Sequence, residues 1–228
     1  MLNTRNTSQS PVGVGIYALS EVAKYTKASP DTIRYWFLGH TDRPEPILSR
    51  AGVKQHADIT VTFHDLIDAY VVARFREHGV TLQYLRRIYD ALAKEFGQSH
   101  PFSRKDFYTD GHKVFVSYFE ESGGELLKEL LTNQQGFPKI LKQFLTQIDY
   151  DKSTSLATRW RIHEGIVIDP ARRFGKPIVE SCGVPTGILA TAYRANSRDT
   201  HIVADWYEIS VEDVARAVAF ENILSHAA

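Results

Sequence analysis

The first apolar pattern along the chain lies between residues 19 and 37 and predicts two short helices joined by a polar turn. Ser29 and Pro30 suit the start of the second helix, because a serine hydroxyl accepts a free first-turn N–H and proline tolerates the first helical position. Gly39 suits its end. The inner faces are predicted to consist of Leu19, Val22 and Ala23 on the first helix and Ile33, Trp36 and Phe37 on the second.

The next segment contains prolines and a glycine turn, and it predicts a strand pair. Ile47-Leu48 and Ile59–Val61 can pair around Ala51-Gly52. A strand pair directly after two short helices is typical of a wing, so the N-terminal part is expected to form a winged helix-turn-helix. The wing is expected to carry three basic residues, Arg43, Arg50 and Lys54.

Two longer helices are predicted after the wing. Thr62 caps the first, which runs to about His78, with Asp65 as its partner in a capping box. Thr81 caps the second, whose apolar positions step by three and four residues. Two heptads are too few for a coiled coil, so we expect this seam to pack within the chain, with a dimer contact as the alternative. The seam comprises Leu82, Leu85, Tyr89, Leu92 and Phe96.

The middle of the chain predicts a hairpin at Asp110-Gly111, followed by apolar helices over Leu126–Leu131 and Pro138–Ile148. Short extended pieces flank Glu164-Gly165, which we take as a domain boundary. The expected organisation is a disordered tail over 1–15, a winged helix-turn-helix with a helical extension over 16–97, a hairpin and helical connector over 98–164, and a C-terminal helical domain over 165–228.

The pattern of the opening helices returns near the C-terminus. Ala204 and Ser210 have the spacing of Ala23 and Ser29, and the overlay needs no gap. Each copy has valine before its alanine and a β-branched residue four positions after its serine. We therefore expect a second helix-turn-helix-like unit within a three-helix domain, and a mainly α fold with short β-hairpins. An ordinary helical corner is the alternative.

The exposed chemistry of the two copies differs. Glu208 and Glu212 in the second copy repel phosphate and favour a protein contact, whereas the first copy has groups that suit phosphates and base edges. Regional charge agrees, since residues 1–60 hold seven Lys/Arg and five Asp/Glu while residues 165–228 hold six and eight. The DNA contacts expected on the first copy are Lys27, Thr32, Arg34 and Tyr35.

Composition is that of a globular protein with 228 residues, 43% of them hydrophobic and 24% charged, and with zero net charge. No apolar run reaches the ~18 residues of a membrane span, and the N-terminus has no signal-peptide pattern. Cys182 is the only cysteine, so no internal disulfide can form. We expect a cytoplasmic protein with no membrane association.

The chemistry-bearing residues do not assemble a catalytic or metal-binding pattern. No two histidines lie four residues apart, and a single cysteine rules out a CxxC pair. Cys182 has no identifiable base in the sequence around it, and the carboxylates are scattered over predicted helix surfaces. We therefore expect a protein that is not an enzyme and needs neither a metal nor a cofactor.

Two stretches resemble known families. Residues 16–96 resemble the MerR type of winged helix-turn-helix, through "LSEVAKYTKASPDTIRYW", the wing and "REHGVTLQYLRRI". Residues 165–224 resemble a small uncharacterised domain common among VapB-type antitoxins. Its markers here are Asp169-Pro170, Gly175-Lys176-Pro177, Val184-Pro185 and Ile209-Ser210 followed by Asp213-Val214.

The second resemblance implies a type II toxin–antitoxin module in which the partner is a PIN-type ribonuclease toxin. The hypothesis is an antitoxin and repressor that binds operator DNA as a homodimer through Lys27, Thr32, Arg34, Tyr35, Arg50 and Lys54, and contacts the toxin through Glu208 and Glu212. One alternative is a free-standing MerR-like transcription regulator with a C-terminal ligand-binding half. Another is an adaptor in which neither helical unit touches DNA.

Overall fold

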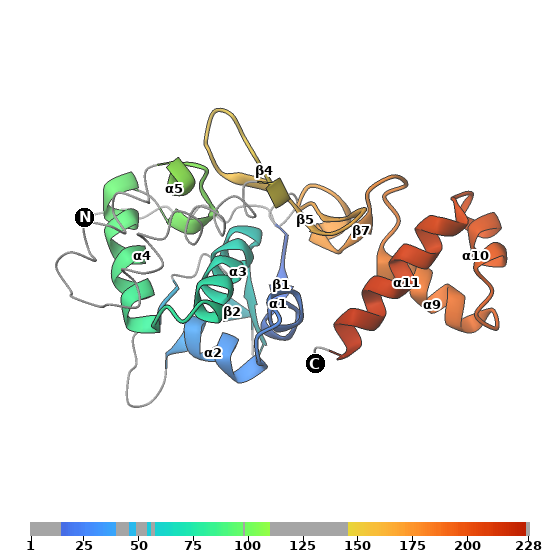
Figure 1. Cartoon of the computed structure of the whole chain (residues 1–228), viewed down its shortest axis with the longest axis horizontal. Helices are drawn as coiled ribbons and strands as arrows, with labels where there is room; N and C mark the ends of the chain where they lie inside the picture. Colours follow the sequence, from blue (N-terminus) through green and yellow to red (C-terminus); the bar gives the residue numbers. More distant parts are fainter. Residues whose placement is uncertain are drawn as a thin grey trace.

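The computed structural model describes residues 15–39, 46–48, 54–55, 58–97, 99–109 and 146–226. Helices predominate in this part of the chain, and two small antiparallel sheets accompany them (Figure 1). Several expectations concern residues outside this part of the chain. They are the N-terminal tail up to residue 14, the wing residues Arg43 and Arg50 with the neighbouring turn Ala51-Gly52, the hairpin at Asp110-Gly111, and the helix over Leu126–Leu131. Only the end of the helix expected over Pro138–Ile148 is described, and Ile148 there begins a strand.

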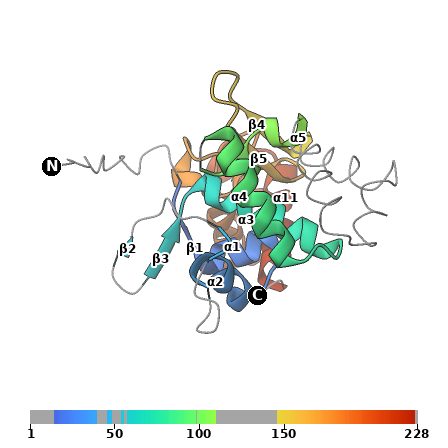
Figure 2. The ribbon, with the colours of Figure 1, turned by 90° about the vertical axis from the view of Figure 1, so that its left-hand side faces the viewer.

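The first sheet joins the start of the chain to the expected wing. Strands β1 (Tyr17–Ala18), β2 (Lys54–Gln55) and β3 (Asp58–Val61) pair in the order β1-β3-β2, all antiparallel. Helices α1 (Leu19–Thr26) and α2 (Pro30–Leu38) lie between β1 and β2 in the sequence. Figure 2 shows β2 and β3 reaching away from the helices on one side.

The strand predicted at Ile47-Leu48 is wrong, because Lys54–Gln55 pairs with β3 instead. Ile47 and Leu48 are both buried, and both backbone N–H groups donate to the carbonyl of Trp36, at 2.9 and 3.1 Å. Successive strand residues face opposite sides of a sheet, so two adjacent buried residues do not suit an outer strand of a wing. They instead anchor the chain to the end of α2.

The two longer helices are α3 (Phe63–Glu77) and α4 (Leu82–Phe96), and both begin as predicted. Thr62 and Asp65 form the capping box of α3, and the Thr81 hydroxyl accepts from the first turn of α4. All five residues of the α4 seam pack in or against the main hydrophobic cluster, which confirms intramolecular packing. A 3-10 turn, η1 (Pro101–Ser103), and a short helix, α5 (Asp106–Thr109), follow.

The second sheet connects the two halves of the molecule. Its strands are β4 (Ile148–Tyr150), β5 (Ala157–His163), β6 (Ile166–Ile168) and β7 (Ile178–Val179), paired antiparallel in sequence order. The residues taken as a domain boundary, Glu164-Gly165, form the turn between β5 and β6. Trp160 belongs to the main cluster and Ile166 to the second, so this sheet contributes to both cores.

The C-terminal part consists of a 3-10 turn, η2 (Arg173–Gly175), and the helices α9 (Thr186–Ala195), α10 (Thr200–Tyr207) and α11 (Val211–His226). These helices lie beyond the second sheet, on the side away from α4 (Figure 1). Their inner faces form the second cluster, which comprises Ile166, Val179, Leu189, Val203, Ala204, Val214, Ala217 and Phe220.

The two halves touch along α1. Lys176, just after η2, forms an ion pair with Glu21 of α1, and α1 also contacts α11. Gly175 has φ +77°, and a Cβ there would overlap the Tyr17 hydroxyl, so the close approach of η2 to β1 depends on glycine. None of the described helices is long and apolar enough to cross a membrane.

Candidate functional site: two matched helix pairs

The first helix pair, α1 with α2, turns sharply at Lys27. Lys27 adopts the left-handed conformation (φ 58°, ψ 30°), and its N–H is bonded to the carbonyls at the end of α1. Ala28 N–H donates to Ala23 O at 3.1 Å. The Ser29 hydroxyl then accepts from the Thr32 N–H at 3.1 Å, which confirms Ser29 as the N-cap of α2.

The second helix pair, α10 with α11, repeats this geometry 181 positions later, since residue 19 corresponds to residue 200. With this offset, both ends of α1 coincide with both ends of α10, and the first residue of α2 coincides with the first residue of α11. Glu208 occupies the left-handed position (φ 53°, ψ 47°), and Ile209 N–H donates to Ala204 O at 3.1 Å. Ser210 accepts from the Asp213 N–H at 3.1 Å. The repeated sequence pattern therefore encodes a repeated local structure.

Among the predicted DNA contacts, Lys27 and Arg34 are exposed. Thr32 is half-buried, and its hydroxyl accepts from Ser29 at 2.8 Å. Tyr35 is also half-buried and packs against the main cluster, so only part of its ring faces solvent. Of these four predicted contacts, the two cations are therefore exposed, whereas Thr32 and Tyr35 partly contribute to the fold.

The remaining predicted DNA contacts belong to the expected wing. Lys54 lies in β2, opposite Ile59 of β3, at the edge of the first sheet. Arg50, four residues earlier in the sequence, lies outside the described residues.

Two equivalent positions of the pairs carry opposite charge, while a third, Asp31 and its counterpart Glu212, is acidic in both. Lys24 corresponds to Asp205 and Lys27 to Glu208, and all four side chains are exposed. Arg34 corresponds to Ala215, so the exposed cation of α2 has no counterpart on α11. One backbone arrangement is therefore used twice, with more exposed cations on the first pair and more exposed carboxylates on the second.

The predicted toxin contacts lie at the turn and the first turn of the second pair. Glu208 and Glu212 are both exposed. Asp213 donates its N–H to the Ser210 hydroxyl, and its carboxylate accepts from Ser181 and Arg216, at 2.7 Å each. Asp213 thus ties α11 to the turn after β7, whereas Glu208 and Glu212, like Asp205, face solvent.

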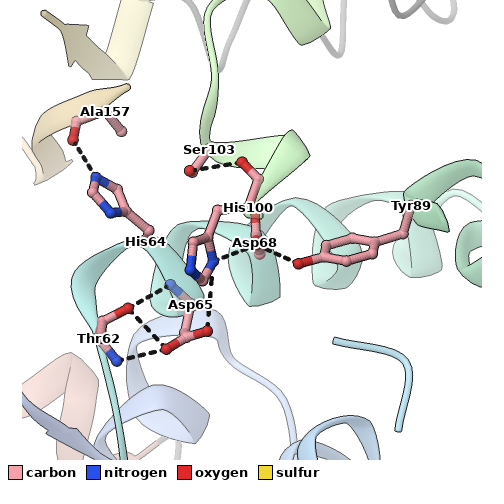
Figure 3. A network of polar contacts seen from close by, with 8 residues as sticks. All are labelled: Thr62, His64, Asp65, Asp68, Tyr89, His100, Ser103 and Ala157. Atoms are coloured by element: carbon pink, nitrogen blue, oxygen red, sulfur yellow. Dashed lines mark hydrogen bonds and ion pairs between the residues drawn. The ribbon is translucent and has the colours of Figure 1, made fainter. Parts of the chain in front are cut away.

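A buried polar network at the base of α3 was not predicted from the sequence (Figure 3). His100 Nδ1 lies 3.1 Å from Asp68 Oδ2 and 3.5 Å from Asp65 Oδ1, and both carboxylates are fully buried. Tyr89 donates to Asp68 at 3.1 Å. The network fixes α3, and with it the end of β3, to η1. The available signal was the pair of aspartates within an otherwise apolar stretch of helix.

Burial and charge act against each other in this network. Burial raises the pKa of Asp68, although His100 opposes that shift. Burial lowers the pKa of His100, but the hydrogen bond and charge of Asp68 outweigh it and leave the pKa raised. Burial lowers the pKa of His64, whose Nε2 lies 3.0 Å from Ala157 O. In the part of the chain that the structure describes, no group of His, Cys, Asp and Glu suits a metal ion.

Lys27→Gly is expected to raise the free energy of unfolding by about 0.5–1 kcal/mol, because a non-glycine residue is disfavoured at a positive φ. Lys27→Ala serves as the matched control, since it removes the charge but keeps the disfavoured conformation. Urea unfolding checks the result, and equal stabilities for the two variants would contradict it.

Three comparisons relate the chain to known proteins. A family model described as "Protein of unknown function (DUF433)" matches residues 166–220. A Mycobacterium tuberculosis protein named "Putative antitoxin VapB45" is 27% identical over 225 residues, which cover 90% of this chain and 93% of the relative. The crystal structure of Rv2018 from M. tuberculosis superposes with a TM-score of 0.73 at 26% identity, covering 91% of this chain and 99% of that one. The likeness to these two proteins therefore extends over most of the chain, whereas the family model covers β6, β7, α9, α10 and the first part of α11.

Proposed function

We propose that this chain is the antitoxin of a type II toxin–antitoxin module. The first helix pair and the β2–β3 hairpin act as a winged helix-turn-helix that binds operator DNA. The second pair neutralises a PIN-type ribonuclease toxin. The chain acts in the cytoplasm as a homodimer and repressor, without enzymatic activity of its own.

The observation that carries this proposal is the inversion of charge between two matched helix pairs. DNA binding needs cations that face phosphates, which Lys24, Lys27 and Arg34 provide. The acidic surface of the second pair suits instead a protein that binds RNA, because the substrate groove of such a protein is basic. A relative named "Putative antitoxin VapB45", aligned along nearly the whole chain, supports the antitoxin role.

Arg34→Ala is expected to weaken binding to DNA from the promoter of the chain's own operon by ~1–3 kcal/mol, because an arginine near the start of a recognition helix contacts a base edge. Wild-type log K should fall with log[salt] at a slope of roughly −4 to −7, as for about four to eight phosphates in a dimer. Gel-shift titration over a series of salt concentrations checks both results.

Arg194→Ala is the matched control, since it removes an exposed arginine from α9 in the other half of the molecule. Unchanged affinity in a folded Arg34→Ala protein would remove Arg34 from the DNA interface. Equal losses in both variants would point to a general charge effect rather than to the first helix pair.

A second candidate function is a transcription regulator that responds to a small molecule. Two cavities of about 470 and 270 Å³ lie between α1 and α11, and both are bordered by Lys24, Tyr25 and Leu224. A ligand there would touch the first helix pair directly, and the larger cavity exceeds the ~300 Å³ that is typical of ligand sites. An operator affinity that depends on an added metabolite, with no toxin bound, would favour this function over the first.

A further inference from the structure

An apolar surface lies exposed on α10. Trp206 is 65% exposed, Ile202 40% and Tyr207 36%. Ile202 and Trp206 are four residues apart, so their side chains are neighbours on one side of the helix. None of the three belongs to the second cluster or packs against it. Adjoining exposed apolar side chains of this size mark interaction surfaces on soluble proteins, and tryptophan is enriched at such surfaces.

The matched first pair shows what covers this face when the partner lies in the same chain. Trp206 corresponds to Tyr25, which is only 8% exposed and packs edge-on against Tyr17 of β1, with ring centroids 6.3 Å apart. Tyr207 corresponds to Thr26, whose carbonyl accepts from Arg74 of α3 at 2.9 Å. Within the described residues no strand or helix takes the place of β1 and α3 over α10. The exposed face of α10 therefore corresponds to the face of α1 that is buried against β1 and α3. It does not correspond to the surface of the first pair that carries Arg34.

The surroundings of this face are acidic. Between Asp199 and Ala215 the sequence contains no lysine or arginine. Asp205 and Glu208 lie within two residues of Trp206 and are exposed, and Glu212, in the first turn of α11, is exposed as well. Phosphate would be repelled here, whereas a protein surface with an apolar pocket rimmed by cations would complement both the aromatic side chains and the carboxylates.

We infer that the α10 face, formed by Ile202, Trp206 and Tyr207, docks into the basic substrate groove of a ribonuclease partner. Trp206 is the central anchor, and Asp205 and Glu208 pair with cations that would otherwise bind RNA phosphates. Docking in this way occludes the groove, which makes the contact inhibitory. The inference rests on the proposed function, and it names the surface by which that function is exerted.

The test uses the full chain and the protein encoded by the neighbouring gene. Calorimetry gives the dissociation constant for wild type, Trp206→Ala and the matched control Ile223→Ser, which removes an exposed apolar side chain from α11. Trp206→Ala is expected to weaken the complex about thirtyfold or more, as for a central interface tryptophan, while Ile223→Ser stays within about threefold of wild type. Thermal unfolding of Trp206→Ala should match wild type, because the side chain is exposed.

Several results would overturn the inference, and they differ from failure of the proposed function. Wild-type affinity in a folded Trp206→Ala protein would exclude the α10 face while leaving the antitoxin role intact. A change from dimer to monomer with an unaltered complex would assign the face to a second copy of this chain. A loss of operator affinity would assign it to DNA. Absence of any complex with wild type would overturn the toxin-binding function, and this inference with it.

Discussion

Replacing His100 with alanine is expected to lower the free energy of unfolding by about 3–5 kcal/mol, because removing one partner of a buried ion pair leaves uncompensated charge. Asp65 and Asp68 are fully buried within one turn of α3, and His100 is the cation between them (Figure 3). In the variant Asp65 still accepts the capping hydrogen bonds from Thr62, so the carboxylate that loses its cationic partner is mainly that of Asp68. Urea unfolding near neutral pH measures the loss.

The double variant His100→Gln with Asp68→Asn is the matched control. Removing both charges together avoids the stranded carboxylate, so its cost should be well below that of His100→Ala. Tyr89 can still donate to the amide oxygen at position 68. Equal losses in the two variants would show that shape, rather than charge, governs this site.

The same network sets a pH dependence. The pKa of His100 is raised in the folded protein, so its contribution is fully present below about pH 6.5 and is lost as the pH rises through the folded value. The raised pKa of Asp68 acts in the same direction. The lowered pKa of His64 acts oppositely, and its effect is confined to pH values below about 6.5. Wild-type stability should therefore decline on the alkaline side of about pH 6.5, and the double variant should lose that decline.

Local signals in the sequence predicted the helices well. Ser29, Thr62 and Thr81 each cap the helix assigned to them, because capping depends only on residues within one turn. The internal repeat was also visible, since a fixed interval between an alanine and a serine encodes the same turn twice. Non-local pairing was not predictable in this way. The partner of β3 on one side is Tyr17–Ala18, more than forty residues away, and no local pattern specifies it.

The candidate site was predicted only in part, because the exposure of a side chain depends on tertiary packing as well as on helical periodicity. Helical periodicity placed Arg34 on the outside, and the structure agrees. It could not show that Tyr35 packs against the main cluster, because that depends on neighbouring elements. Trp206 was missed, since a large apolar residue in a helix is ordinarily assigned to a core. Its exposure became meaningful only when the matched Tyr25 was found buried.

Trp36→Ala is expected to cost about 3–5 kcal/mol of unfolding free energy, because it empties a large core site. Trp36 is 2% exposed and belongs to the main cluster, on the inner face of α2. Its carbonyl also anchors Ile47 and Leu48, the last described residues before the hairpin. A cavity at this position should therefore loosen the connection from α2 to β2, so that operator affinity falls even at temperatures at which the variant remains folded.

Trp36→Phe separates the two effects. The indole N–H of Trp36 is buried and has no hydrogen-bond partner in the described structure, so phenylalanine removes an unsatisfied donor while keeping most of the ring contacts. Its cost should be about 1–2 kcal/mol, below that of alanine. Urea unfolding and gel-shift titration of both variants provide the comparison. A melt insensitive to Trp36→Ala would place the residue at the surface and reverse the assigned faces of α2. Full operator affinity in a destabilised but folded Trp36→Ala protein would mean that the hairpin is positioned by β1 and α3 alone.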